Sequence, residues 1–499
     1  LRAIGFGSDD EIKNLFKDID KGASDLIDIT LAKDPTKNTD EALLEIFRKM
    51  RPGDPVVLDN AKAFLEGMFF NRRRYNLSRV GRFKINKRLG IGIPNTPENS
   101  VLTKEDVIES IKYLIRLING EGRTDDIDHL ANRRIRRVGE LVQQNAFRSG
   151  ILRLERVIKE RMSLLAQDQE IVPAGLVNAK PIIASVNEFF RSSQLSSILD
   201  RINPLSELDH LRRLSVMGAG GVTRERVSFS IRDINHSQYG RIDAIRSPEG
   251  QNIGLVTYLT LFSRINEYGF LETPYRKVEL KNGKPKVSDE WIYLAADDEE
   301  NLTITEATVE IDKQGFIIQK RVPARRGGEF LEVSATEVNF IDISPQQIVG
   351  TSASLIPFLA HDDANRALMG THMQCQAVPL VKPQAPIIGT VMEGVVAANT
   401  GRVVRAPEDG TVSYVDSTKV ILKTRKGEIP FEIKQFDNSP QGTCYTQRPT
   451  VSLNQKVKTG DLLFDGAASD GGELSLGTNL MIAYMSFDGL GYEDAIVIS

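Results

Sequence analysis

The sequence predicts an α+β protein built from several domains. The chain has 499 residues, more than the roughly 100–200 of a usual single domain. Apolar residues at helical spacing dominate up to about residue 188, and beyond it short strand-like runs alternate with turn residues. About three to five domains are therefore expected, with helices concentrated early and strands late.

The composition is that of an ordinary globular protein, with 40% hydrophobic and 26% charged residues. A net charge of −3 argues against a chain that coats nucleic acid over its whole surface, but it allows local basic tracks. The two cysteines, Cys375 and Cys444, are far apart, which excludes a disulfide framework or a Cys-based zinc site. This fits a reducing, cytoplasmic compartment. No apolar run approaches the ~18 residues of a membrane span, so no membrane association is expected.

The first part of the chain combines acidic helical stretches with polar loops, which is typical of a peripheral domain. A basic strip follows at 71–90, with eight basic residues, no acidic residue, and two interleaved aromatics, Tyr75 and Phe83. A solvated surface is the simpler interpretation. A strip that faces phosphates is favoured because no carboxylate balances it.

Two helical stretches come next. Thr103 as N-cap, Asp106 at the third helical position and Gly120 at the end predict a helix of about four turns. Residues 132–161 hold nine basic and three acidic residues, and their apolar side chains recur at helical spacing. This pattern predicts an amphipathic helix with a basic face.

Short strands are predicted from there on. The runs "VSFSIRDI" (227–234) and "VTYLTLF" (256–262) are typical of strands, and 291–343 indicates a small antiparallel module. A helix follows residue 346. Short strands punctuated by Gly and Pro then predict barrels or sandwiches.

Familiar catalytic motifs are incomplete. "MGAGG" (217–221) resembles a phosphate-cradling turn, but no Lys-Ser or Lys-Thr follows it, so it fails as a P-loop. Arg224 and Arg226 would put two cations on a loop tip, which suits a nucleic-acid backbone, and a salt-bridged turn is the alternative. His210 has no Ser or Cys partner nearby in an elbow or triad context, so a nucleophilic hydrolase has little support.

Acidic residues occur in two further places. In "HDDANRALMG" (361–370), Asp362 or Asp363 is expected to cap a helix. Capping does not explain Arg366. An Arg near a helix start opposes the helix dipole, and this cost is compensated if the Arg meets an anion. In "SFDGLGYEDAIVIS" (486–499) we expect a strand after an acidic turn, which would place Glu493 and Asp494 on opposite faces.

Two segments, 406–423 and 451–467, look like the paired halves of a biotinyl or lipoyl carrier sandwich. Carriers modify a Lys within a Met-Lys-Met turn. None occurs here, so the fold is expected and the carrier function is rejected.

Long motifs in chain order resemble the β subunit of bacterial DNA-directed RNA polymerase. They are "SSQLSSILDRINPLSELDHLRRLS", "GGVTRERVSFSIRD", "YGRIDAIRSPEGQNIGL", "NEYGFLETPYRKV", "SLIPFLAHDDANRALMGTHMQCQAVPL" and "GYEDAIVIS". With its start at Leu1 and its end at Ser499, the chain looks like a central segment of that subunit without the N- and C-terminal parts.

The resemblance implies a division into five regions. A lobe-like domain and a basic, protrusion-like domain are expected to mix helices and strands, and a β-rich fork and a small antiparallel external module to follow. The last region would be a truncated hybrid-binding domain of double-psi-barrel type with inserted sandwich-hybrid hairpins. In this order the regions are 1–70, 71–188, 189–262, 263–345 and 346–499.

The resemblance also implies roles for individual residues. Arg366 would meet the triphosphate of the incoming nucleotide, and Asp363 would orient its helix. Glu493 and Asp494 would lie near a second Mg²⁺ that the nucleotide delivers, with Asp494 facing it through water. Gln376 would hold the RNA near its 3′ end.

Two nucleic-acid surfaces are implied as well. Arg224 and Arg226 would contact downstream DNA. The RNA-side channel and rifamycin pocket would be lined by Gln194, Asp200, His210, Arg213, Ser215, Pro248 and Asn252.

The implied reaction is template-directed RNA synthesis, in which an RNA 3′-hydroxyl attacks the α-phosphorus of an NTP. The catalytic Mg²⁺ would be held mainly by the β′ subunit, and an α dimer, an ω subunit and a sigma factor would be further partners. The alternative is a non-catalytic nucleic-acid-binding scaffold derived from such a subunit.

Several positions depart from the family pattern. Ser197 and Ile202 replace residues that offer more hydrogen bonds, which predicts weakened rifamycin sensitivity. Arg246 stands in place of an acidic residue, and Cys375 stands where Arg is frequent.

Overall fold

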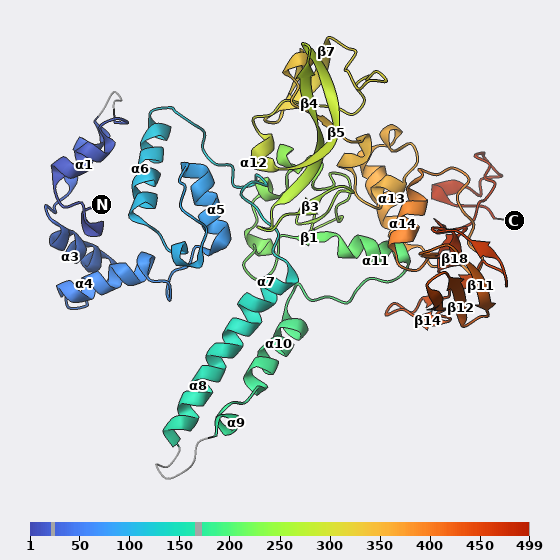
Figure 1. Ribbon diagram of the computed structural model, residues 1–499, viewed down its shortest axis with the longest axis horizontal. Helices are drawn as coiled ribbons and strands as arrows, with labels where there is room; N and C mark the ends of the chain where they lie inside the picture. Colours follow the sequence, from blue (N-terminus) through green and yellow to red (C-terminus); the bar gives the residue numbers. More distant parts are fainter. Residues whose placement is uncertain (21–24, 165–171, 499) are drawn as a thin grey trace. The chain divides into compact units, whose positions relative to one another are not determined.

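The computed structural model describes residues 1–20, 25–164 and 172–498 (Figure 1). The chain forms two compact units, Leu1–Ile127 and Asp128–Ser499. The division after Ile127 falls inside the predicted region 71–188, and the five predicted regions remain a prediction.

The described residues of the first unit form helices joined by loops, without strands. Its main helices are α1 (Asp9–Phe16), α2 (Leu26–Lys33), α3 (Thr39–Met50), α4 (Leu58–Leu65), α5 (Ser78–Leu89) and α6 (Lys104–Ile118). The predicted start of α6 is confirmed: Thr103 is the N-cap, and its side chain and that of Asp106 form a reciprocal capping box. Ile12 and Phe16 of α1 and Ile115 of α6 belong to one buried apolar cluster.

The basic strip contains one arginine that belongs to the core. Arg82 of α5 and Asp106 of α6 are each 1% exposed, and Arg82 Nη1 lies 2.7 and 2.8 Å from the two carboxylate oxygens. Arg82 also donates to the carbonyls of Asn99 and Val101. This residue of the strip therefore joins two helices and does not face a phosphate.

The second unit begins with helices. They are α7 (Val138–Val142), α8 (Arg148–Leu164), α9 (Pro173–Leu176) and α10 (Lys180–Ser192), with a π-helical turn at Gln143–Phe147. A Cβ on Gly150 of α8 would lie 3.1 Å from the Cα of Ile182, so a glycine lets α8 and α10 approach closely (Figure 1).

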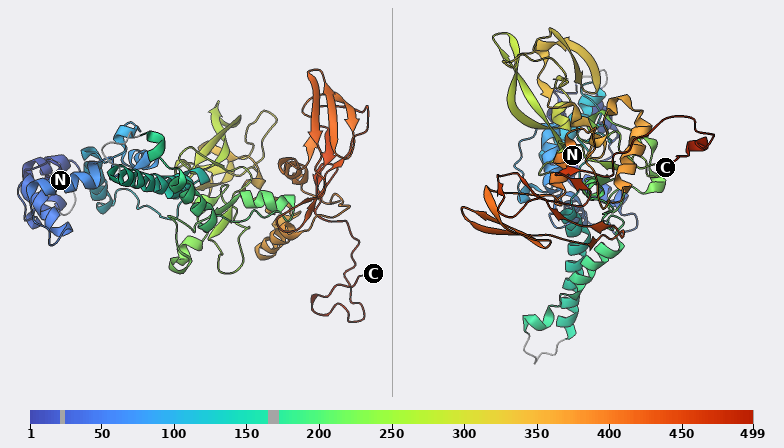
Figure 2. Two further views of the ribbon diagram at one scale, coloured as in Figure 1. Left: turned by 90° about the horizontal axis from the view of Figure 1, so that it is seen from below. Right: turned by 90° about the vertical axis from the view of Figure 1, so that its right-hand side faces the viewer.

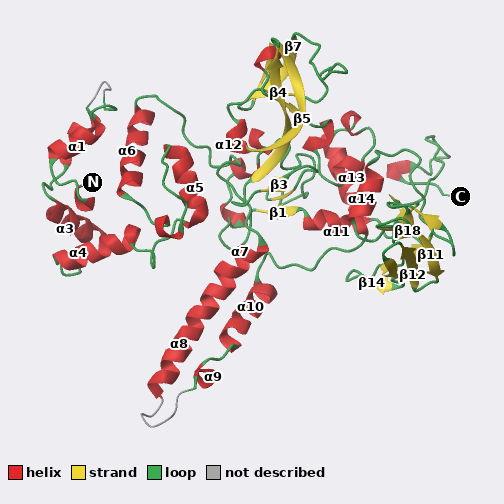
Figure 3. Ribbon diagram, in the orientation of Figure 1, coloured by secondary structure: helices red, strands yellow, loops and turns green. Residues whose placement is uncertain are grey.

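No strand occurs in the described residues before Arg213 (Figure 3). The expectation of strands in the lobe-like and protrusion-like regions is therefore wrong for 1–20, 25–164 and 172–188. The physical reason is that apolar residues here recur at three- and four-residue spacing, which buries them between helices and leaves no alternating face for a sheet.

A seven-stranded sheet forms the middle of the second unit. Its strands are β3 (Arg264–Ile265), β4 (Leu271–Lys281), β5 (Lys284–Ala295), β6 (Ile304–Thr305), β7 (Arg321–Arg326), β8 (Glu329–Ser334) and β9 (Phe340–Asp342). All its pairings are antiparallel except β6 with β9. Asn282 and Gly283, with φ of 53° and 73°, form the two-residue turn of the β4–β5 hairpin.

Two small sheets lie near the end of the chain. One has the order β13 (Gly427–Glu432), β12 (Lys419–Thr424), β11 (Gly410–Val415), β17 (Lys456–Val457); the other has β10 (Val404–Arg405), β18 (Leu462–Asp465), β16 (Arg448–Pro449). Val412, Leu422 and Leu463, all 0% exposed, belong to one core cluster that both sheets share. The chain is thus a mixed helix-and-sheet protein, as predicted.

Two predicted strands are wrong. Within 227–234, Phe229–Arg232 forms a 3-10 turn, and Phe229 is 87% exposed. Within 486–498, Tyr492–Asp494 forms a 3-10 turn in an exposed, extended segment that leaves the sheets (Figure 2). Both runs have strand-like composition, but no neighbouring strand pairs with them among the described residues, and a strand needs that pairing. No described helix combines the length and apolarity that crossing a membrane requires.

Candidate functional site

The predicted site centres on the helix α13 (Ala364–Gln376), in contact with α11 (Pro204–Leu211) (Figure 1). Asp363 is the N-cap of α13, and its carboxylate accepts the N–H of Asn365 at 3.4 Å. Ala367, Thr371 and Cys375 are buried at four-residue spacing. The exposed side carries Arg366, Met369, Met373 and Gln376.

Arg366 occupies the first turn of α13 and is exposed. Its guanidinium contacts Met369 Sδ at 3.6 Å. Within the described part of the chain it forms no ion pair with a carboxylate. A cation so placed, at the positive end of a helix dipole, is available to an anion.

His210, at the end of α11, makes contacts on both ring nitrogens. Nδ1 accepts the backbone N–H of Asp200 at 3.0 Å, and Nε2 lies 3.4 Å from the hydroxyl of Ser197. Burial, followed by the nearby charge of Arg213, lowers the pKa of His210. The ring is therefore neutral near pH 7 and helps to fold the segment around it.

The other predicted RNA-side residues lie on adjoining segments. Arg213 and Ser215 are exposed on β1 (Arg213–Ser215), which pairs antiparallel with β2 (Val256–Tyr258). Asn252 precedes β2, and its buried Oδ1 has no hydrogen-bond partner among the described residues. Half-buried Asp200 and Pro248 and exposed Gln194 complete the set.

The predicted DNA-side loop is a 3-10 turn, Arg224–Arg226. Arg224 is exposed, and its Nη1 lies 3.5 Å from Gln251 Oε1, whereas no ion pair with Glu225 is seen in this described turn. The side chain of Arg226 lies outside what the structure describes.

The acidic pair lies in the exposed segment that follows the last strand. Glu493 and Asp494 are exposed, with φ of 49° and 62°, and neither shows a hydrogen bond or ion pair to α13 within 1–20, 25–164 and 172–498. No group of three or more His, Cys, Asp or Glu side chains in those residues could hold a metal ion. The described residues therefore show no direct bond between the acidic pair and α13, and the joint role of Arg366 and Asp494 stays a prediction.

A buried polar cluster was missed by the sequence analysis. Arg246 Nη2 lies 3.0 Å from Asp209 Oδ2, Arg246 Nη1 donates to Thr371 Oγ1 at 3.2 Å, and Ser352 Oγ donates to Asp209 Oδ1 at 2.9 Å. Arg246 Nη2 also lies 3.6 Å from Cys375 Sγ. The available signal was that Arg246 and Cys375 both depart from the family pattern, and the structure places them in contact.

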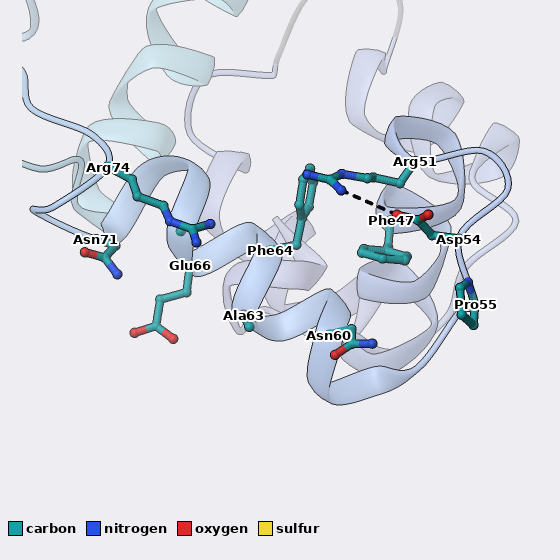
Figure 4. A pocket seen from close by; sticks show the side chains of 11 residues that line it. Phe47, Arg51, Asp54, Pro55, Asn60, Ala63, Phe64, Glu66, Asn71 and Arg74 are labelled. Atoms are coloured by element: carbon teal, nitrogen blue, oxygen red, sulfur yellow. Dashed lines mark hydrogen bonds and ion pairs between the residues drawn. The ribbon is translucent and has the colours of Figure 1, made fainter. Parts of the chain in front are cut away.

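Two surface hollows contain none of the predicted site residues. One, in the first unit, is lined by Phe47, Arg51, Phe64 and Arg74, among others (Figure 4). Arg51 is occupied there: it pairs with Asp54 at 3.4 Å and lies over the Phe64 ring at 5.6 Å.

The second hollow lies between the seven-stranded sheet and residues 234–244. The charges of its two arginines are balanced by ion pairs, since Arg241 pairs with Glu299 and Arg325 pairs with Asp342.

Family models match four successive parts of the chain. They are RNA polymerase Rpb2 domain 2 (1–136), Rpb2 domain 3 (197–265), the RNA polymerase beta subunit external 1 domain (275–344) and Rpb2 domain 6 (405–499). A protein of Syntrophomonas wolfei named DNA-directed RNA polymerase subunit beta is 48% identical over 100% of this chain and 44% of its own length. The chain belongs to the RNA polymerase β-subunit family.

Further β-subunit relatives agree. Those of Sorangium cellulosum and Geobacter metallireducens are 47% and 48% identical, each over 94% of this chain and 34% of the relative. The chain thus spans less than half the length of these relatives. The part matched by Rpb2 domain 3 contains α11, β1 and β2. The part matched by Rpb2 domain 6 contains Glu493 and Asp494.

Proposed function

We propose that this chain is part of the catalytic core of a DNA-directed RNA polymerase and contributes contacts to the nucleotide, the RNA–DNA hybrid and downstream DNA. Its family membership gives the reaction class. The observation that carries the proposal is the guanidinium of Arg366 in the first turn of α13. It is exposed and has no carboxylate partner among the described residues.

In this proposal Arg366 binds the triphosphate of the incoming NTP. A guanidinium stays charged and does not exchange a proton at neutral pH, so its role is to hold negative charge and position the α-phosphorus, not acid–base chemistry. Gln376, at the other end of the same helix face and about 15 Å along the axis at 1.5 Å per residue, holds the RNA near its 3′ end. Asp363 fixes the start of the helix that carries both.

The proposal assigns the DNA contacts and the RNA contacts to different segments of the chain. Arg224 and Arg226 contact the downstream DNA backbone from their loop. The RNA-side channel, which would also take rifamycin, is lined by Gln194, Asp200, His210, Arg213, Ser215, Pro248 and Asn252.

Mg²⁺ enters this proposal as a partner-held ion. Asp494, with Glu493 beside it, would face a Mg²⁺ through water. Among the described residues no third His, Cys, Asp or Glu side chain joins them to form a group that could hold the ion. When bound, Mg²⁺ polarises phosphate oxygens and neutralises their charge. We propose that the β′ subunit supplies its main ligands, with an α dimer, an ω subunit and a sigma factor as further partners in the cytoplasm. The double-psi-barrel and sandwich-hybrid assignments of 346–499 belong to the same proposal.

The test is template-directed incorporation of labelled nucleotide by the native complex, captured through this chain. Arg366→Ala should reduce incorporation strongly, since an anion-binding cation is lost. Arg321→Ala removes another exposed arginine, which lies on β7 and not on α13, and should leave activity unchanged. A complex that contains β′ and binds DNA but incorporates nothing would overturn the proposal in favour of the non-catalytic scaffold.

A further inference from the structure

α11 and α13 are joined at one end by a single buried amide. Asn203 is 0% exposed and is the N-cap of α11, where its Oδ1 accepts the N–H of Ser206 at 2.8 Å. Its Nδ2 lies 2.9, 3.2 and 2.9 Å from the carbonyl oxygens of Gln374, Cys375 and Ala377. These carbonyls belong to the last turn of α13 and to its C-cap, Ala377, where helices leave acceptors unsatisfied. One side chain thus begins one helix and closes the other.

A second link joins the C-terminal part of α11 to the middle of α13. Asp209 of α11 and Arg246 are 4% and 6% exposed, and the guanidinium of Arg246 bridges from Asp209 to Thr371 of α13. Arg246 also lies over the ring of Tyr258, at 4.9 Å from its centroid. The two links hold α13 at its middle and at its C-terminal end.

These bonds determine where α13 lies. The buried side of the helix is made of small side chains, Ala367, Thr371 and Cys375, which offer little shape to resist sliding or rotation. Apolar burial is not directional, whereas hydrogen bonds require particular distances and angles. A buried ion pair is, moreover, weak support for stability as such, and fixing a unique arrangement is one of its attested uses.

We propose that Asn203 and Arg246 are positioning residues for the reaction: they fix α13 on α11 so that Arg366 and Gln376 are correctly placed relative to the 194–215 segment. This inference rests on the proposed function. It adds two residues that touch neither nucleotide nor RNA and act through the helix that does.

Two substitutions break the links with little other change. Asn203→Ser keeps a good N-cap for α11 but removes the amide donors that reach α13. Arg246→Lys keeps the charge but cannot bridge Asp209 and Thr371 as a planar fork does. Arg241→Lys is the matched control, since Arg241 is 0% exposed, is ion-paired with Glu299, and contacts neither helix.

The measurement is single-nucleotide addition by the assembled complex, with kcat and KM determined separately. Because a displacement of about 1 Å can cost up to 100-fold in rate, we expect kcat/KM for the NTP to fall on the order of tenfold or more in both variants, mainly through kcat. Arg241→Lys should leave it within about twofold. In the Arg366→Ala background the same two substitutions should cost clearly less than in the unmodified chain, because one of the two groups that they position is gone.

Full additivity with Arg366→Ala, or a loss no larger than that of Arg241→Lys, would overturn the inference. If Arg246→Lys prevents assembly of the complex, Asn203→Ser alone decides. Failure of the proposed function looks different, because the unmodified complex would then incorporate no nucleotide at all.

Discussion

Ser197 and His210 face each other across the turn before α11, with Ser197 Oγ 3.4 Å from His210 Nε2. Because His210 Nδ1 already accepts the N–H of Asp200, both ring nitrogens are engaged within the chain. The short hydroxyl of exposed Ser197 adds little hydrogen-bonding capacity to the surface around this ring.

Ser197→Gln should therefore increase rifamycin sensitivity. The longer amide adds a donor and an acceptor at an exposed position of the proposed inhibitor pocket. The check is the inhibition constant of the reconstituted complex, with Ser193→Gln as a control for a longer amide elsewhere in the segment. An unmodified complex that rifamycin inhibits as strongly as a sensitive polymerase would contradict the prediction.

Arg82→Met should destabilise the first unit. It leaves Asp106 as an unpaired buried carboxylate, a change that typically costs about 3–5 kcal/mol of the free energy of unfolding. Hydrogen exchange of the α5 and α6 amides would report it. Arg72→Met, at an exposed arginine of the same basic strip, should stay within about 0.5 kcal/mol, and equal effects of the two changes would refute a core role for Arg82.

Acidification should weaken the fold around α11. The pKa of His210 is lowered from an ordinary value of 6.5 by burial and by Arg213, so the unfolded chain takes up this proton more readily than the folded chain does. The contribution of neutral His210 to the free energy of unfolding is fully present above pH 6.5. It is lost as the pH falls from there through the folded-state pKa of His210.

His210→Gln should flatten the dependence of unfolding free energy on pH in that window. Denaturant unfolding at a series of pH values measures it. His372, whose pKa is also lowered by burial, would account for a remaining slope. A slope that does not change in the variant would exclude His210 as a source.

Cys375 should resist alkylation in the native protein. Burial, followed by the charge of Asp209, raises the pKa of its thiol to about 12, so almost no thiolate is present at neutral pH. Mass spectrometry after a short iodoacetamide pulse should find Cys444, which is exposed, modified and Cys375 intact until the chain is unfolded. Comparable modification of both in the native state would contradict the burial of Cys375.

Local signals in the sequence were sufficient for part of this structure. Thr103 and Asp106 predicted the start of α6 because a capping box involves only residues three apart. Asp362 and Asp363 could not be separated from sequence, since both suit an N-cap, and the structure selects Asp363. The strands expected at 227–234 and within 486–498 are not formed, because strand composition does not show whether a pairing neighbour exists.

The candidate site could be predicted only as separate segments. Arg366 was identifiable because it is unfavourable for its helix position, which is a local property. Asn203 was not, since its three acceptors lie more than 170 residues away in sequence. Arg82 looked like part of a phosphate-facing strip for the same reason: its carboxylate partner lies on another helix.

Asn203 and Asp209 both reach α13 from one short helix, and this constrains how the gene can change. One codon added or deleted between them would turn Asp209 by about 100° around the axis of α11 and carry it away from Arg246, while Asn203 kept its place. Most base substitutions at Leu211, which is exposed and belongs to neither link, should leave both links intact. The exposed positions of this helix can therefore be substituted, whereas insertions and deletions between Asn203 and Asp209 break a link.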